Sequence, residues 1–141
     1  LLIVTCAFIA IPVTALVARH PSDVPERLRA TLDVFPAGSV VLNDHSLSGW
    51  LLWREPQLVP VLDLRTEIFS NAYVKVYLRN AEVRPGWRSF LTATKPSSAL
   101  LRSESTIRWA LQQELPWVPL QTAQGFTVLR DPEVPSTVIR K

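Results

Sequence analysis

The chain has 141 residues and a mass of 15.9 kDa. This is about one domain on the usual scale of ~100–200 residues, which excludes a large multidomain enzyme within it. Hydrophobic residues make up 48% of the sequence and charged residues 19%, below the ~25% typical of soluble domains. The formal net charge is +3, but the basic residues are scattered among the acidic ones and form no basic stripe. We therefore expect no nucleic-acid partner.

The apolar excess is concentrated at the N-terminus, where residues 1–18 carry no charge and Arg19 is the first charged residue. A run of this length is at the lower limit for crossing a hydrocarbon core of ~30 Å, and no polar face recurs at helical spacing. No basic residue precedes the run and only a poor cleavage site follows it, which argues against a signal peptide. A buried core helix remains the alternative, because Pro12 and two threonines interrupt the apolar surface.

From this pattern we expect a transmembrane helix over residues 1–18, a small α/β domain over residues 19–131 and a loose tail over residues 132–141. The sequence begins with Leu and contains no Met, so we expect the first segment to be the last membrane span of a longer protein. Cys6 is the single cysteine, which excludes an intrachain disulfide. His20 and His45 lack companions at metal-ligand spacing, so we expect no metal and no other cofactor.

The first elements of the domain follow one another at short intervals. The spacing of apolar residues predicts a helix over residues 26–34. Residues 39–43 are continuous and apolar, as in a buried strand, and a short helix ending near Arg54 follows. Residues 59–64 have the character of a second buried strand, with Pro60 at its start or on a sheet edge. A strand, a helix and a strand joined by short connections indicate a parallel βαβ unit.

The second half of the domain contains further helices and strands. Ser70 and the segment 84–86 are the expected starts of two helices, and residues 98–101 form a weakly signalled third strand. Ser103 is the expected cap of an amphipathic helix, and residues 117–130 predict a hairpin. The expected fold class is α/β: one N-terminal transmembrane helix, then a small three-layer domain with a mostly parallel sheet and a C-terminal hairpin.

Ligands of open α/β sheets bind beyond the carboxyl ends of the strands, and this sequence offers one polar cluster there. It comprises Asn43, Asp44 and His45 after one strand and Asp63 and Arg65 after the next. Two carboxylates and a histidine can act as general acid and base. The structural alternative is that Asp44 caps the next helix and Asp63 pairs with an arginine. We favour this alternative and assign no catalytic residue, because structural ion pairs place carboxylates together just as active sites do.

Other motifs for catalysis are missing from the sequence. The four glycines form neither a nucleophile elbow nor a Gly-rich phosphate loop. The tryptophans are expected in the core and at interfaces rather than in a sugar-stacking platform; they are Trp50, Trp53, Trp87, Trp109 and Trp117. We do not expect the domain to be a self-sufficient enzyme.

Three motifs carry a resemblance to a known family: VLNDHSLSGWLLW over residues 41–53, VPVLDLRTEIF over residues 59–69 and RPGWRSFL over residues 84–91. They resemble the C-terminal extracytoplasmic domain of bacterial polytopic membrane glycosyltransferases of the GT-C type, which are similar to protein mannosyltransferases. The sequence departs from the family pattern at Leu64, where glycine is common. The matching positions are Asn43, Asp44, Gly49, Trp50, Leu51, Trp53, Asp63, Arg65, Tyr77, Pro85, Gly86 and Trp87.

The resemblance implies a longer protein that transfers a sugar from a polyprenyl-phosphate donor to an acceptor. Its catalytic carboxylate would lie in an early loop that is absent from this sequence. This chain would be a non-catalytic accessory domain on the outer side of the bacterial cell membrane. Its partners would be the membrane, the upstream membrane-spanning part, the sugar donor and the acceptor. The alternative, from another class, is a membrane-anchored module that binds a partner through exposed aromatic side chains.

Overall fold

The computed structural model describes residues 24–63, 65 and 68–134, so the transmembrane helix expected over residues 1–18 lies outside the described residues. Within these described ranges, no helix combines the length and the apolar character needed to cross a bilayer. The first elements are the 3-10 helix η1 (Glu26–Leu28) and the short helix α2 (Arg29–Leu32). Together they take the place of the single helix predicted over residues 26–34.

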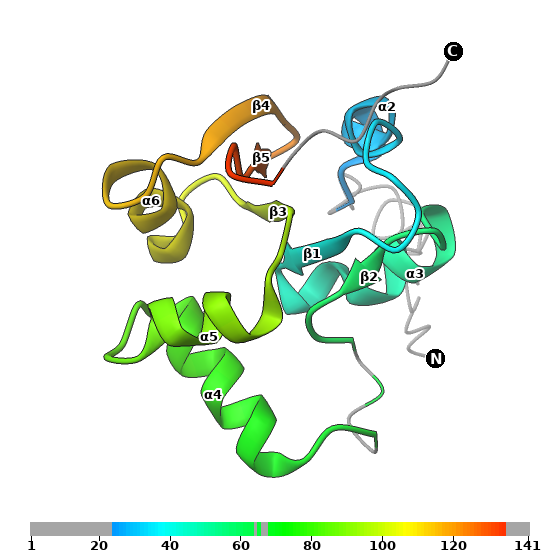
Figure 1. Ribbon diagram of the computed structural model, residues 1–141. Helices are drawn as coiled ribbons and strands as arrows, with labels where there is room; N and C mark the ends of the chain where they lie inside the picture. The colour runs from blue at the N-terminus through cyan, green and yellow to red at the C-terminus, as the bar shows by residue number, and fades with distance from the viewer. Residues whose placement is uncertain (1–23, 64, 66–67, 135–141) are drawn as a thin grey trace, which may run out of the picture.

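A five-stranded sheet forms the centre of the domain (Figure 1). β1 pairs in parallel with β2 and β3, whereas β5 pairs antiparallel with β3 and β4, so the strand order is β2-β1-β3-β5-β4. The strands are β1 (Val40–Asn43), β2 (Val59–Pro60), β3 (Ser98–Arg102), β4 (Val118–Ala123) and β5 (Phe126–Arg130).

The predicted fold class is wrong in its description of the sheet. The sheet is mixed, with two parallel and two antiparallel pairs, rather than mostly parallel. The reason is that the hairpin does not stand apart from the sheet: β5 pairs along the whole of β3 and then carries β4 as the edge strand.

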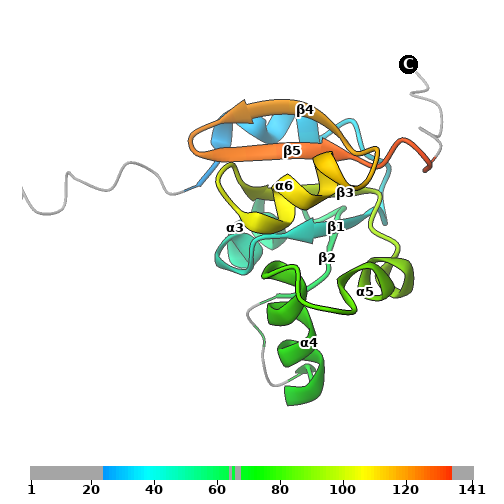
Figure 2. The same cartoon turned by 90° about the vertical axis from the view of Figure 1, so that its left-hand side faces the viewer.

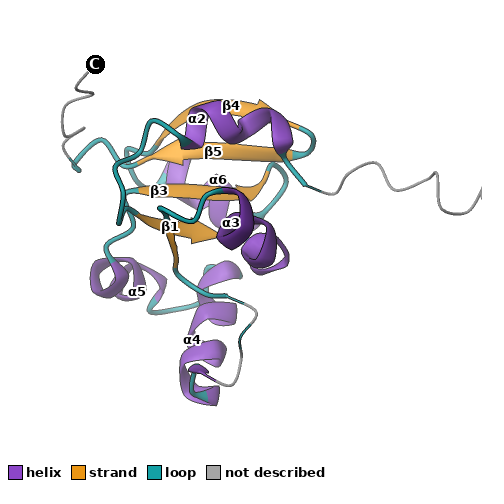
Figure 3. Ribbon diagram, turned by 90° about the vertical axis from the view of Figure 1, so that its right-hand side faces the viewer, coloured by secondary structure: helices purple, strands orange, loops and turns teal. Residues whose placement is uncertain are grey.

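Helices cover both faces of the sheet (Figures 2 and 3). Successive strand residues point to opposite faces, so Val41 and Leu100 enter one core cluster and Leu42 and Leu101 the other. The first cluster includes residues of η1, α2 and α3, and the second includes residues of α4, α5 and α6. The helices not yet delimited are η2 (His45–Leu47), α3 (Ser48–Arg54), α4 (Asn71–Ala81), α5 (Trp87–Thr94) and α6 (Thr106–Gln113).

Strand β2 ends at Pro60, although the sequence predicted a strand through residue 64. It lies at the sheet edge, where the missing N–H of proline leaves no ladder position empty. The backbone N–H of Val61 still donates to the carbonyl oxygen of Val41 at 2.9 Å. Beyond this point the Asn43 side chain replaces the ladder, because its Nδ2 donates to the carbonyl oxygen of Leu62 at 2.9 Å.

Two of the expected helix starts have different outcomes. The Ser70 prediction is confirmed, since its Oγ accepts a hydrogen bond from the backbone N–H of Tyr73 at 3.2 Å. The Ser103 prediction is wrong, because α6 begins after Ser105. Ser103 instead lies in the turn after β3, where its hydroxyl and that of Thr127 are 2.9 Å apart.

Candidate functional site at the carboxyl edge of the sheet

The carboxyl ends of β1 and β3 form the topological switch point of the sheet. β1 lies between β2 and β3 and is parallel to both. The connection from β1 to β2 passes through α3 on one face, whereas the connection from β2 to β3 passes through α4 and α5 on the other. At such a point the connections diverge and leave a crevice in which ligands of α/β proteins usually bind. The side chains here are therefore the first candidates for function.

Asn43 ends β1 and is fully buried. Besides Leu62, its Nδ2 donates to Ser48 Oγ at 3.0 Å and to the carbonyl oxygen of Asp44 at 3.2 Å. Its own carbonyl oxygen accepts a hydrogen bond from the Tyr77 hydroxyl at 2.5 Å, and burial raises the pKa of Tyr77 above its usual range. One side chain thus joins β1, α3 and the segment after β2, and its backbone holds α4. The Asn43 Oδ1 faces the backbone N–H of Leu62 at 3.4 Å, so both ends of this amide contact the fold.

Asp44 follows β1 and forms the N-cap of η2. Its Oδ1 accepts hydrogen bonds from the backbone N–H of Ser46 at 3.0 Å and from the Ser46 hydroxyl at 2.6 Å. Its Oδ2 lies 3.5 Å from Nε of Arg102 at the end of β3. His45 is at the surface, with Nδ1 3.9 Å from Asp44 Oδ1 and a side chain that is 60% exposed. The carboxylate therefore acts as a cap and as an ion-pair partner.

Asp63 and Arg65 form a closed pair after β2. The Asp63 carboxylate accepts hydrogen bonds from the backbone N–H of Arg65 at 2.8 Å, from its Nε at 2.9 Å and from its Nη2 at 2.5 Å. These hydrogen bonds from Arg65 hold the pKa of Asp63 below its usual range, although burial opposes them. The Asp63 side chain is buried, whereas that of Arg65 is 60% exposed. The pair closes the turn after β2 and keeps a carboxylate ionised at the edge of the core.

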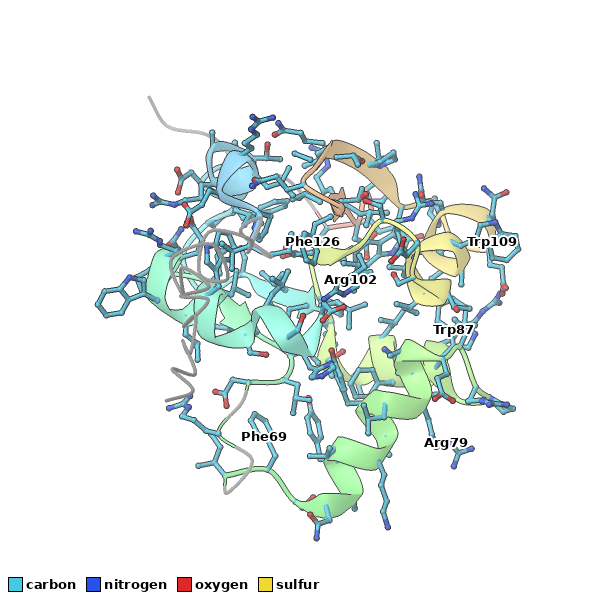
Figure 4. All side chains as sticks on the ribbon, turned by 180° about the vertical axis from the view of Figure 1, so that it is seen from behind. Phe69, Arg79, Trp87, Arg102, Trp109 and Phe126 are labelled. Atoms are coloured by element: carbon cyan, nitrogen blue, oxygen red, sulfur yellow. The ribbon has the colours of Figure 1, made fainter. Side chains whose placement is uncertain are left out.

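The predicted cluster is thus resolved into three structural units. Asn43 binds the residue before Asp63, Asp44 caps η2, and Asp63 binds Arg65. Sequence reasoning missed Arg102, which faces Asp44 and whose guanidinium carbon lies 5.2 Å from the ring centre of Phe126 (Figure 4). The sequence did contain a hint of this role, because Arg102 directly follows the predicted third strand. In the observed strand order that strand lies beside β1, so the residue after it lies near Asp44.

No family model, curated protein or solved structure matches this chain. The resemblance to GT-C glycosyltransferases therefore stays a prediction. Across residues 24–63, 65 and 68–134, no group of three His, Cys, Asp or Glu side chains is arranged to hold a metal ion.

The tryptophans divide into buried and exposed groups. Trp87 and Trp117 are buried, and Trp50 is half-buried, with its Nε1 donating to Glu26 Oε1 at 3.0 Å. Trp53 on α3 is 80% exposed and Trp109 on α6 is 56% exposed. Because α3 and α6 pack against opposite faces of the sheet, these two indoles belong to different surfaces. They do not form the adjacent aromatic pair that a sugar-stacking platform requires.

Proposed function

We propose that this chain is a non-catalytic accessory domain of a membrane glycosyltransferase-like protein and contributes binding and packing rather than acid–base chemistry. The observation that carries the proposal is the state of the two candidate carboxylates. Asp44 and Asp63 both accept hydrogen bonds from residues two positions further along the chain, and both face an arginine. A general base needs a lone pair directed at its substrate. The oxygens of these two carboxylates instead face hydrogen-bond donors and arginines of the same domain.

The residues behind the family resemblance support the same proposal. Asn43, Asp63, Arg65 and Tyr77 belong to the three motifs or match the family pattern outside them. Asn43 joins β1 to the segment after β2, Tyr77 joins α4 to β1, and Asp63 and Arg65 close the turn after β2. A motif of this kind specifies a domain architecture. Sugar transfer passes through a cationic transition state that needs a correctly placed carboxylate, so the chemistry would be supplied by another part of the longer protein.

Two measurements test this proposal. The first is to read the gene upstream of the Leu1 codon: a series of apolar spans with an acidic first loop supports the proposal, whereas a start codon directly before Leu1 contradicts it. The second is to measure sugar transfer by the full-length protein with Asp63→Asn or Asp44→Asn. We expect kcat per folded molecule to stay within about threefold of the parent, because neither carboxylate touches the reacting atoms.

The opposite result would overturn the accessory role. A loss of kcat by a factor of about 100 with an unchanged melting temperature would place the carboxylate in the reaction, since one lost catalytic group costs that much or more. The control is Asp33→Asn, which removes an exposed carboxylate at the end of α2. It corrects for the change in net charge.

The second candidate is a module that binds a protein partner without any catalytic function in the longer protein. The exposed indole of Trp53 favours it, because large aromatic side chains at this exposure are typical of interaction surfaces. This candidate requires residues 19–141 to fold as an independent monomer. A cooperative unfolding transition and a monomeric mass in solution support it, and aggregation of this segment counts against it.

A further inference from the structure

A pocket of about 190 Å³ lies where α4 ends and α5 begins, away from the carboxyl edge of the sheet. Arg79 and Asn80 line it from the last turn of α4, and Gly86 and Trp87 line it from the start of α5. Arg84 contributes from the turn that joins the two helices. Figure 4 shows Arg79 on α4 and Trp87 on α5 on the same side of the molecule.

Asn80 is the unusual residue of the pocket. It is only 2% exposed, and its Oδ1 is buried without a hydrogen-bond partner in the part of the chain that the structure describes. Buried side-chain amides almost always have a partner, so an acceptor without one at the wall of a pocket calls for an explanation, and a bound ligand is one. The fold does not require this amide for its own hydrogen bonds. This is the observation that points to a ligand.

Positive charge surrounds the same pocket. The Arg79 guanidinium forms no ion pair with any residue in the described ranges, and α4 contains no acidic residue. Arg84 donates through Nε to Glu82 Oε2 at 3.0 Å, and both side chains are more than 60% exposed. Such an exposed pair is weak and leaves the two terminal nitrogens of the guanidinium for another acceptor.

The two helix ends add to this positive character. Among the described residues no side chain caps the N-terminus of α5, where Gly86 adopts a left-handed conformation with φ of 97°. The N–H of Trp87 donates to the carbonyl oxygen of Arg84 at 3.1 Å, so only the N–H groups that follow it are available. Backbone N–H groups at such a terminus favour an anion. The C-terminus of α4 does not oppose it, because the carbonyl oxygens of Arg79 and Asn80 accept hydrogen bonds from Arg84 and Val83. The negative end of one helix is thus satisfied within the turn.

We propose that this pocket binds a phosphate monoester whose organic part carries a hydroxyl group. The guanidinium groups of Arg79 and Arg84 and the N-terminus of α5 bind the phosphate oxygens, and the hydroxyl group of the ligand donates a hydrogen bond to Asn80 Oδ1. The volume lies below the ~300–1,000 Å³ of pockets for drug-sized molecules, which suits a small ester such as a sugar phosphate. This proposal concerns a separate surface and does not depend on the proposed accessory role at a membrane.

The test is a binding titration of the 141-residue chain with glucose 1-phosphate, methyl phosphate and inorganic sulfate. Calorimetry measures the affinity, and NMR chemical-shift changes of residues in α4 and α5 locate the site. We expect glucose 1-phosphate to bind most tightly, because methyl phosphate lacks the hydroxyl for Asn80 and sulfate lacks the organic part altogether. Arg79→Gln should weaken glucose 1-phosphate binding by about tenfold, which corresponds to one charge-assisted hydrogen bond. Arg79 is exposed, so this variant keeps the fold.

The matched control is Arg27→Gln, which removes an exposed arginine in η1 on the other face of the sheet. Equal affinity of both variants, or equal binding of glucose 1-phosphate and sulfate, would overturn the proposal in favour of nonspecific charge attraction. No detectable binding of any phosphate ester would overturn it as well.

The source of the phosphate group is distinguished by a vesicle arm. Phosphatidylcholine vesicles with and without phosphatidylinositol 4-phosphate present the same phosphate and hydroxyl groups on a lipid. Binding that requires this lipid and falls with Arg79→Gln assigns the pocket to a lipid headgroup. Binding of glucose 1-phosphate without vesicle binding assigns it to a soluble ester. The absence of both overturns the site.

Discussion

Asn43 and Asn80 are two asparagines at nearly the same depth, with exposed fractions of 0% and 2%, yet their surroundings differ completely. The Asn43 amide makes hydrogen bonds to Ser48, to Leu62 and to the carbonyl oxygen of the next residue. The Oδ1 of Asn80 has no partner in the described part of the chain. A buried amide with partners stabilises the fold, whereas one without partners costs stability that a ligand can return. Burial of a polar side chain alone does not separate structural from binding residues.

Asn43→Leu gives the largest expected effect. Leucine has a similar size but leaves the buried backbone N–H of Leu62 without its partner, and it removes one of the two donors to the Leu62 carbonyl oxygen, the other being Ser48 Oγ. We expect the free energy of unfolding to fall by about 3 kcal/mol, because each buried polar group left unpaired costs ~1–3 kcal/mol. Urea denaturation followed by tryptophan fluorescence measures it.

The matched control is Asn71→Leu, at the exposed first residue of α4. It should change stability by no more than about 0.5 kcal/mol, as is usual for surface positions. Similar losses for both variants would show that asparagine at position 43 has no special structural role.

Gly86→Ala tests the entrance of the α4–α5 pocket. The position has φ of 97°, and no atom of the described residues lies within 4 Å of an added Cβ, so the expected cost comes from the backbone. We expect a loss of about 1–2 kcal/mol in the free energy of unfolding, the usual cost of the left-handed region for a residue with a Cβ. The same substitution at Gly49, within helix α3, should be neutral or stabilising, because alanine is the better helix former. A loss at Gly49 as large as that at Gly86 would contradict this backbone explanation.

The sequence predictions succeeded where a feature depends on neighbouring residues and failed where it depends on residues far apart in the chain. Ser70 is confirmed as a cap because a serine before an apolar helix needs only the next three residues to act. The mixed sheet was not predictable, because the pairing of β5 with β3 depends on contacts between residues about 30 positions apart. The length of β2 was overestimated because the Asn43 side chain, from another strand, replaces its ladder after Pro60.

The sequence predicted the carboxyl-edge residues better than the pocket. Asn43, Asp44, Asp63 and Arg65 follow strands, and polar residues at strand ends are a recognisable pattern. Asn80 occupies an ordinary position in an amphipathic helix, and only the packing of α5 against α4 buries it. Arg79 and Arg84 likewise have no distinctive pattern in the sequence. They come together only through the turn between the two helices.

Asp63→Asn tests the ion pair at the carboxyl edge of the sheet through the pH dependence of stability. The pKa of Asp63 is lowered in the folded state, so its contribution is fully present above the unfolded-state value near ~4 and is lost as the pH falls through the folded value. We expect the variant to be less stable by about 1 kcal/mol at neutral pH, since the partner Arg65 is largely exposed. The difference should shrink below about pH 4, where the parent carboxylate becomes protonated. A difference that stays constant down to pH ~2 would assign the effect to shape rather than to charge.

Asn80→Leu gives the smallest expected change in stability and separates the two asparagines most sharply. No hydrogen bond to a described residue is lost, and leucine removes a buried acceptor that has no partner and favours the helix. We expect the free energy of unfolding to stay the same or to rise by up to about 1 kcal/mol, while the affinity for glucose 1-phosphate falls. Urea denaturation and calorimetry on the same preparation measure both quantities. A loss of stability comparable to that of Asn43→Leu would mean that the fold itself needs the Asn80 amide, and the contrast between the two regions would disappear.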